Sequence, residues 1–191
     1  MIDKSEEFRV LKADCIACRK CSIGGCVYED CPGNVFSNMS LRAKIMVIGQ
    51  NPGAVEVQTG RPFVGPSGEN FDEVVMEVLG VDRSAFYITN IVKCFTPNNR
   101  SPRGYEIDNC QEFLEREIAI VKPEIVITLG SPALRQMTGV SGITKHHGEI
   151  IPSPRYRVNV LPLFHPSPLN FNDKTKRAAF CQELINLKRY L

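Results

Sequence analysis

The chain has 191 residues, a net charge of +2 and eight cysteines. This length is enough for one domain with a sizeable core, and no apolar run approaches the roughly 20 residues that a membrane span needs. The modest positive charge permits a nucleic-acid partner but does not by itself predict one. The N-terminal sequence MIDKSEEFRV lacks a hydrophobic signal-peptide core, so we expect a single cytoplasmic domain over residues 1–191.

The first 40 residues combine a predicted helix, at residues 3–14, with an unusual density of cysteines. Five cysteines fall within 17 residues, at Cys15, Cys18, Cys21, Cys26 and Cys31. Two thiolates three residues apart can bind one metal centre from a tight turn. In a chain without a secretion signal, such a cluster favours metal binding over disulfides. We therefore predict a metal-binding arm rather than a set of buried free thiols.

A continuous apolar run at Ala43–Ile48 predicts a parallel strand that is covered on both faces. It leads directly into the turn Gly49-Gln50-Asn51-Pro52-Gly53, whose two glycines let the backbone approach a ligand closely. The two amide side chains stand at the carboxyl end of a strand, where open α/β sheets bind ligands. From this stretch alone, a plain strand-to-loop turn is an equal alternative.

A Gly- and Pro-rich loop at residues 59–68 carries Phe63 and is followed by a predicted helix at 68–79, with Ser67 as its expected cap. An aromatic side chain on such a loop can stack on a flat ligand. By themselves, however, the residues favour a Phe63 that fills the core below the loop.

The rest of the chain alternates between predicted strands and helices. The strands are expected at Phe86–Val92, Glu124–Leu129 and Arg157–Leu163. The helices are expected at 105–121, in a short stretch after Gly130-Ser131-Pro132, and at 174–190 behind an Asp173 cap. The loop at 139–148 holds His146 and His147, which we expect to be exposed to solvent.

Alternating strands and helices imply a parallel sheet joined by crossovers. We predict an α/β fold, a three-layer α/β/α sandwich around a four-stranded parallel sheet, with a cysteine-rich N-terminal arm. Asn90 is unfavourable within a strand, which is typical of a functional position. The polar side chains that end or follow the predicted strands are Gln50, Asn51, Asn90 and His165. Because the carboxyl ends of parallel strands share one edge, we expect these side chains to form a binding site beside Phe63.

Four motifs in register carry a resemblance to a known family. They are GQNPG at 49–53, GRPFVGPSG at 60–68, TNIVKC at 89–94 with PNNRSP at 97–102, and HPSPL at 165–169. In order and spacing the chain resembles the uracil-DNA glycosylase superfamily from about residue 15 to the C-terminus. The resemblance is strongest to family 4, the iron–sulfur branch.

The resemblance implies a monomeric enzyme of base-excision repair that removes uracil from DNA by hydrolysing the N-glycosidic bond. His165 would donate a hydrogen bond to uracil O2, and Asn90 would read the pyrimidine edge. Phe63 would stack on the flipped base in a pocket bounded by Gly49 and Gly53. Leu169 would act as a wedge in the DNA. The implied DNA contacts are Ser167, Arg100 and Lys174, with Lys176 and Arg177 as further candidates for phosphates or for ordinary solvated surface.

The first motif departs from family 4, which has Glu at position 50 and a small apolar residue at 51. The sequence here, Gln50-Asn51, is similar to the GxNPG of the mismatch-specific and single-strand-selective families, where Asn positions the water. We therefore expect Asn51 to position the water and Gln50 to line the uracil pocket. Of the acidic pair expected after the motif, only Glu56 is present, followed by Val57. A specificity for mismatches or hypoxanthine, and a module that binds damaged DNA without cleavage, are the alternatives.

The resemblance also implies a [4Fe–4S] cluster with a structural role. Cys94 and Cys110 match two family ligands, and Cys18 with Cys21 fits the remaining pair, with Cys15 as the alternative partner. Cys26 and Cys31 lie in an insertion that family 4 lacks. A ferredoxin-like set of Cys15, Cys18, Cys21 and Cys31 is a second possibility, as is an electron-transfer or zinc protein.

Overall fold

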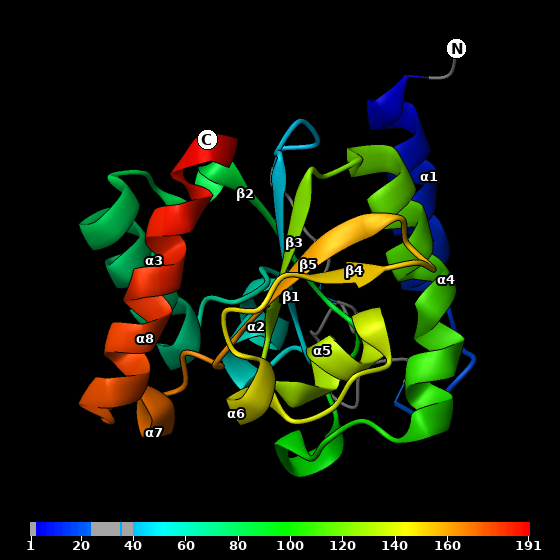
Figure 1. Ribbon diagram of the computed structural model, residues 1–191. Coiled ribbons are helices and arrows are strands. Elements are labelled where there is room, and N and C mark those ends of the chain that lie inside the picture. The colour runs from blue at the N-terminus through cyan, green and yellow to red at the C-terminus, as the bar shows by residue number, and fades with distance from the viewer. Residues whose placement is uncertain (1–2, 24–34, 36–39) are drawn as a thin grey trace.

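The computed structural model describes residues 3–23, 35 and 40–191, and its centre is a five-stranded sheet (Figure 1). The strands are β1 Ile45–Gly49, β2 Phe86–Asn90, β3 Ile125–Leu129, β4 Ile151–Ser153 and β5 Val158–Leu163. Their spatial order is β2-β1-β3-β5-β4. Within these described ranges, no helix is long and apolar enough to cross a bilayer.

The sheet confirms the predicted α/β class, but the expected count of four strands is wrong. β1 pairs in parallel with β2 and β3, and β3 pairs in parallel with β5. The additional strand, β4, runs antiparallel to β5 at the edge of the sheet. β4 has only three residues and contains Pro152, which an edge position tolerates. Such a short segment has too little hydrophobic periodicity to be predicted.

Helices cover both faces of the sheet, which gives three layers (Figure 1). On one face α1, Lys4–Ala17, packs against α4, Gly104–Val121. On the other face α3, Pro66–Leu79, packs against α8, Lys174–Ile185. The four parallel strands are buried along nearly all of their length, because helices lie above and below them.

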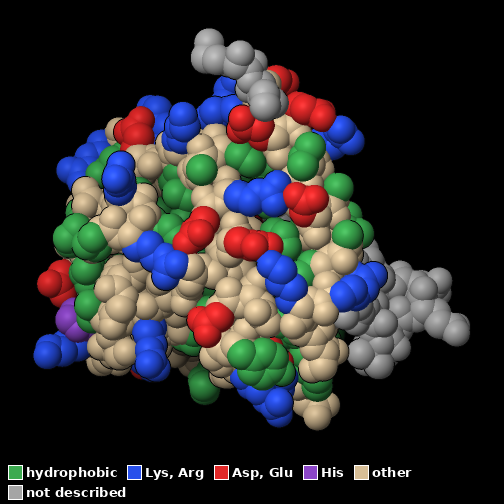
Figure 2. All heavy atoms as spheres, turned by 90° about the vertical axis from the view of Figure 1, so that its right-hand side faces the viewer, with side chains coloured by type: hydrophobic (Ala, Val, Ile, Leu, Met, Phe, Trp, Pro, Cys, Tyr) green, Lys and Arg blue, Asp and Glu red, His purple; other side chains and the backbone are tan. Residues whose placement is uncertain are grey.

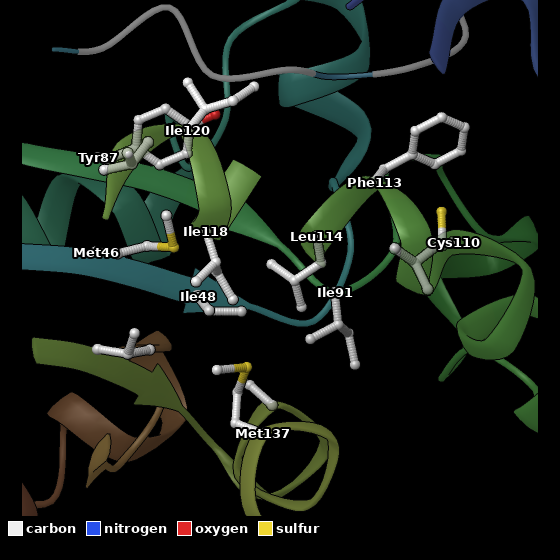
Figure 3. Close-up of a cluster of buried hydrophobic side chains, with 14 of the residues drawn as sticks. Met46, Ile48, Tyr87, Ile91, Cys110, Phe113, Leu114, Ile118, Ile120 and Met137 are labelled. Carbon is white, nitrogen blue, oxygen red and sulfur yellow. The ribbon is translucent and has the colours of Figure 1, made fainter. Parts of the chain in front are cut away.

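Two hydrophobic clusters, one on each face of the sheet, form the core. Figure 3 shows the cluster beneath α1 and α4, which includes Met46, Ile48, Tyr87, Ile91, Cys110, Phe113, Leu114, Ile118, Ile120 and Met137. The opposite cluster includes Ile45, Val47, Phe71, Phe86, Ile88 and Phe180. Each fully buried large apolar side chain contributes about 1.5–3 kcal/mol. Both faces of β1 are therefore anchored, and the turn that follows it starts from a fixed point.

The shorter helices lie mostly at the carboxyl edge of the sheet. They are α2 Ala54–Thr59, α5 Ser131–Thr138, α6 Ile143–His146 and α7 Pro168–Phe171, with 3-10 turns at Arg83–Ala85, Pro97–Asn99 and Asn186–Tyr190. The last of these turns follows α8, so the helix predicted at 174–190 ends as an α-helix at Ile185. The predicted Asp173 cap is confirmed, since its carboxylate accepts hydrogen bonds from Thr175 N at 3.0 Å and Lys176 N at 3.3 Å.

Two local predictions are wrong. Ser67 does not cap α3, because Gly65 is the N-cap and Pro66 takes the first helical position. His146 and His147 are not fully exposed: both are half-buried. His147 stacks on Phe164, with ring centroids 4.1 Å apart, and its Nδ1 accepts a hydrogen bond from Phe164 N at 3.1 Å.

A buried polar network connects β2 to α4. Lys93 and Glu117 form an ion pair in which both side chains are fully buried. The Glu117 carboxylate also accepts hydrogen bonds from Tyr87 Oη at 2.8 Å and Thr89 Oγ1 at 2.9 Å. Lys93 Nζ donates to the backbone carbonyl of Asn90 at 2.6 Å. The network therefore fixes the end of β2, the point at which a predicted site residue stands.

Candidate active site

A cavity of about 480 Å³ opens at the carboxyl edge of the sheet. The residues that line it include Gln50, Asn51, Gly53, Phe63, Asn90 and His165. The structure therefore brings together the side chains that the sequence placed at this edge. A cavity of this size with a few convergent polar groups is typical of a small-ligand site. The role of each residue stays a prediction.

The turn after β1 holds its two amides against each other. Gln50 Nε2 donates to Asn51 Oδ1 at 2.9 Å, and Asn51 Nδ2 donates to the carbonyl of Pro52 at 2.9 Å. Asn51 Nδ2 also lies 3.3 Å from Thr96 Oγ1 on the loop after β2. These contacts direct the oxygen of the Asn51 amide away from Thr96 and Pro52.

Glu56 on α2 joins the turn after β1 to the loop that carries Phe63. One carboxylate oxygen accepts hydrogen bonds from Val64 N at 2.8 Å and Gly65 N at 2.7 Å. The other accepts from Gly53 N at 3.0 Å. Glu56 is buried and lines the cavity, and its three backbone donors make it a clamp between two site loops. Its role is not evident from the sequence, where the available signal is an acid three residues after Gly53.

Phe63 has a left-handed backbone conformation, with φ at 58°, which is costly for an aromatic residue. Arg83 holds it there, since its guanidinium donates to the Phe63 carbonyl at 2.5 Å. A Cβ at Gly68 would lie 1.9 Å from the same carbonyl oxygen, so that position needs a glycine. The Phe63 ring meets Phe71 and His165 edge-on, with centroids 5.8 Å apart in both pairs. Phe63 thus packs on the core and also forms one wall of the cavity.

Asn90, at the end of β2, faces the cavity with an exposed fraction of only 3%. Among the described residues its side-chain amide has no hydrogen-bond partner, whereas its backbone carbonyl accepts a hydrogen bond from Lys93 Nζ. A Cβ at Gly49 would lie 2.5 Å from Asn90 Oδ1, so a glycine there makes room for the amide. A nearly buried amide must find a partner, and here the cavity is the place that offers one.

His165 follows β5 and lines the same cavity. Burial lowers the pKa of its imidazole below the ordinary value for histidine, so the ring is neutral at pH 7. Asn170 Nδ2 donates to the His165 carbonyl at 2.9 Å and fixes the backbone of the HPSPL motif. A neutral imidazole held in this way can donate one hydrogen bond to a ligand in the cavity.

The implied DNA contacts differ in how free their side chains are. Leu169 on α7 is 84% exposed, Lys174 is exposed, and Ser167 is half-buried at the start of α7. Arg100, by contrast, forms a two-pronged ion pair with Glu106, at 2.8 and 2.6 Å. Hydrogen bonds from Arg100 lower the pKa of Glu106 to about 2. A phosphate would therefore have to compete with Glu106 for Arg100.

Other basic side chains are also matched by acids. Arg177 lies 2.8 Å from Glu73 and 3.0 Å from Glu77. Lys176 lies 3.6 Å from Asp173. Figure 2 shows the face formed by α1 and α4, where basic and acidic side chains are interspersed, as in the pair between Arg116 and Asp14 at 2.7 Å. That face lacks the single-sign charge expected of a DNA-binding surface.

Five cysteines gather where α1, the turn after it and α4 meet. Cys15, Cys94 and Cys110 are buried, and Cys18 and Cys21 are half-buried against the same hydrophobic cluster. Burial, together with the neighbouring thiols of the other four, raises the pKa of Cys94. A buried set of thiols has the donor chemistry that an iron–sulfur cluster uses. The described part of the chain contains no group of three or more Cys, His, Asp or Glu side chains close enough together to hold a metal ion. Cys26 and Cys31 lie outside the described residues.

Comparisons with known proteins agree with the resemblance found from the motifs. A family model described as the uracil DNA glycosylase superfamily matches residues 36–187. A type-4 uracil-DNA glycosylase of Sulfurisphaera tokodaii is 33% identical over 174 residues, which cover 87% of this chain and 77% of the relative. One of Thermotoga maritima is 39% identical over 137 residues, 71% of this chain and 70% of that one. A type-5 uracil-DNA glycosylase of Pyrobaculum aerophilum is 36% identical over 149 residues, 69% and 65% of the two chains. The chain therefore belongs to the uracil-DNA glycosylase superfamily.

Proposed function

We propose that this protein is a DNA glycosylase that hydrolyses the N-glycosidic bond of deoxyuridine in DNA and releases uracil, the first step of base-excision repair. The observation that carries the proposal is the meeting of Phe63, Asn90 and His165 in one cavity. An aromatic wall, an amide that has no partner among the described residues and a neutral imidazole are the groups that a flat base with polar edges requires.

Recognition of the base rests on Asn90 and Phe63. The Asn90 side-chain amide can donate a hydrogen bond to uracil O4 and accept one from N3–H at the same time. Cytosine presents the opposite pattern, and binding it would leave buried polar groups unpaired. The Phe63 ring stacks on the flipped base, and its left-handed backbone keeps the ring at a fixed height in the cavity.

Bond cleavage rests on His165 and Asn51. As the bond between C1′ and N1 breaks, its electron pair goes to the base, and His165 donates a hydrogen bond to the developing charge on uracil O2. A donor placed in this way contributes about 3–4 kcal/mol to the transition state. Asn51 orients the water whose oxygen bonds to C1′. An amide cannot take a proton from water at neutral pH, so this water adds late, to a sugar that is already cationic, and the proton that it loses passes to the solvent.

Leu169 on α7 fills the gap that the flipped base leaves in the DNA, and Ser167 and Lys174 contact the DNA phosphate backbone. Flipping a base costs a few kcal/mol, least in mispaired or single-stranded DNA. We expect the protein to act as a monomer in the cytoplasm.

The cysteines, in our proposal, hold a structural [4Fe–4S] cluster through Cys18, Cys21, Cys94 and Cys110, with Cys15 as the alternative to one of the first pair. When bound, the cluster would fasten the end of α1 and the loop after β2 to α4, and it supplies no step of the reaction. Replacing Cys94 by Ala is expected to lower both the iron content and the melting temperature of the purified protein. Unchanged iron content in this variant would exclude Cys94 as a ligand.

The proposed activity is tested with purified protein and oligonucleotides that carry U opposite A, U opposite G, single-stranded U, hypoxanthine or T opposite G. Alkali then reveals abasic sites. Cleavage of all uracil substrates, reduced to a small residual rate in the Asn51→Ala variant while DNA binding is kept, is the expected result. Cleavage restricted to mismatches or hypoxanthine would assign the narrower specificity suggested by Gln50 and Asn51. If the protein bound uracil-containing DNA but no preparation cleaved it, the proposed glycosylase activity would be refuted.

A further inference from the structure

The amide of Asn51 can serve the reaction in only one of its two orientations. To orient a water for attack, the amide must present its oxygen to the cavity. The oxygen can accept a hydrogen bond from the water O–H, whereas the NH₂ group can only donate one. A terminal amide can rotate by 180° at little steric cost, so something must select the productive orientation. The residue that selects it would be part of the site without touching the substrate.

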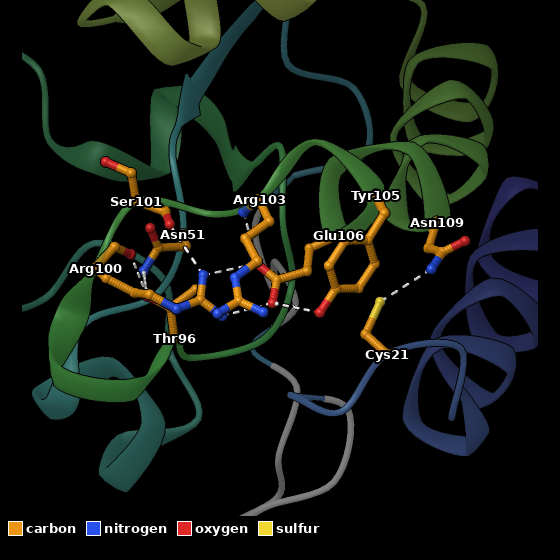
Figure 4. Close-up of polar contacts among 9 residues, drawn as sticks. All are labelled: Cys21, Asn51, Thr96, Arg100, Ser101, Arg103, Tyr105, Glu106 and Asn109. Atoms are coloured by element: carbon orange, nitrogen blue, oxygen red, sulfur yellow. Dashed lines mark hydrogen bonds and ion pairs between the residues drawn. The ribbon is translucent and has the colours of Figure 1, made fainter.

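Thr96 provides this selection through the direction of its hydrogen bonds (Figure 4). Its hydroxyl has a single proton, and Thr96 Oγ1 lies 2.5 Å from the backbone carbonyl of Arg100. A carbonyl can only accept, so the proton of Thr96 is committed there. The remaining contact of Thr96 Oγ1, with Asn51 at 3.3 Å, must therefore be donated by the NH₂ group of Asn51.

Two further oxygens lie on the same side of the Asn51 amide. The Pro52 carbonyl is 2.9 Å from Nδ2, and Asn99 Oδ1 is 3.4 Å away. In the rotated orientation, Asn51 Oδ1 would face the Pro52 carbonyl and Thr96 Oγ1, neither of which has a proton to offer it. In the observed orientation Oδ1 accepts from Gln50 Nε2 at 2.9 Å, and both residues line the cavity.

The loop that carries Thr96 is held under strain. Asn98 and Asn99 both have positive φ, at 54° and 53°, a conformation that persists only when its surroundings enforce it. The ion pair between Arg100 and Glu106 closes the loop, and Glu106 also accepts from Arg103 N at 2.7 Å (Figure 4). Thr96 itself is fully buried behind the cavity. The loop is therefore built to keep one hydroxyl in place.

We propose that Thr96 is a positioning residue, which fixes the Asn51 amide with its oxygen toward the cavity by accepting the amide's N–H, with Asn99 as a second acceptor. The inference rests on the proposed function, because it gives Thr96 a role only through the water-orienting Asn51.

The test compares Thr96→Val, which keeps the shape but removes the hydroxyl, with Thr96→Ser, which keeps the hydroxyl. We expect the single-turnover rate of uracil release to fall about tenfold or more in Thr96→Val and to stay within about threefold of the unmutated protein in Thr96→Ser. The Kd for DNA that carries the uncleavable 2′-fluoro-2′-deoxyuridine should change by less than about twofold, because recognition of the base does not pass through Asn51.

The decisive readout is the dependence on Asn51. Added to Asn51→Ala, the Thr96→Val change should not lower the residual rate further. An equal loss with and without the Asn51 side chain would overturn the proposal and make Thr96 a general support of the loop. Equal rates for the valine and serine variants would also overturn it.

A second pair of variants decides the matter if Thr96→Val does not fold. Asn99→Ala should slow uracil release, whereas Asn98→Ala, which has the same backbone conformation but does not line the cavity, should leave it unchanged. Equal rates for these two would then refute the proposal. If the unmutated protein releases no uracil, the proposed function fails; if Asn51→Ala is fully active, only the roles given to Asn51 and Thr96 fail.

Discussion

Replacing Lys93 by Met should destabilise the protein far more than removing a surface charge does. The change takes away one partner of a fully buried ion pair and leaves the Glu117 carboxylate, among the described residues, with the hydroxyls of Tyr87 and Thr89 as its donors. Breaking a buried pair in this way typically costs about 3–5 kcal/mol. For a chain of this size, that corresponds to a fall of about 6–20 °C in melting temperature.

The measurement is urea or thermal unfolding with a matched exposed control. Arg116→Met removes one partner of the surface pair with Asp14, whose side chains are 40% and 50% exposed, and should cost less than about 1 kcal/mol. The double variant Lys93→Met/Glu117→Gln removes both buried charges and should recover part of the loss. Because Lys93 also binds the Asn90 carbonyl, uracil release should slow in Lys93→Met even below its melting temperature.

Two outcomes would refute this reasoning. A Lys93→Met variant as stable as Arg116→Met would mean that the buried carboxylate is not left uncompensated. A double variant that loses the sum of both single losses would mean that Lys93 and Glu117 do not stabilise each other.

Further expectations follow from the geometry of the cavity. The Asn90→Asp carboxylate offers only acceptors to uracil O4, so the rate of uracil release in a glycosylase assay should fall by at least about 100-fold. The melting temperature of this variant should stay the same. Gly68→Ala, whose Cβ would meet the Phe63 carbonyl at 1.9 Å, should lower stability by about 1–3 kcal/mol, whereas Gly104→Ala, with nothing within 4 Å, should not; equal melting temperatures would contradict the clash. Burial lowers the pKa of His165 in the folded state, so the unfolded chain binds more protons and stability should fall as the pH drops below about 6.5 toward that lowered pKa. His165→Gln should make unfolding curves measured between pH 5 and 7, a range of about two units around the histidine pKa, less dependent on pH.

The sequence predicted the edge of the sheet where the cavity lies because buried strands leave a strong signal. The apolar run before Gly49 and the polar residues after each strand are enough to place Asn51, Asn90 and His165 together. The boundaries of the parallel strands lie within two residues of those predicted. The family motifs then supplied roles that the spacing alone does not contain.

The sequence did not predict the contacts that depend on which backbone group faces a side chain across a loop. Glu56 binds three N–H groups and Thr96 one carbonyl, and neither partner can be identified before the loops are folded. The same is true of Arg100, which was expected near phosphates but pairs with Glu106. The prediction of Ser67 as a cap was wrong because the helix begins one residue earlier, at Pro66, which places Ser67 inside the first turn.

The exposed leucine of α7 has a thermodynamic consequence for the free protein. At 84% exposure, Leu169 forgoes nearly all of the roughly 1.5–3 kcal/mol that burying a leucine side chain provides. When the same side chain is inserted between base pairs it is buried from water, and this burial free energy then favours the DNA complex. The amount is comparable with the few kcal/mol needed to unstack one base. Burial of this one exposed side chain would thus offset a large part of the free energy that unstacking the base costs.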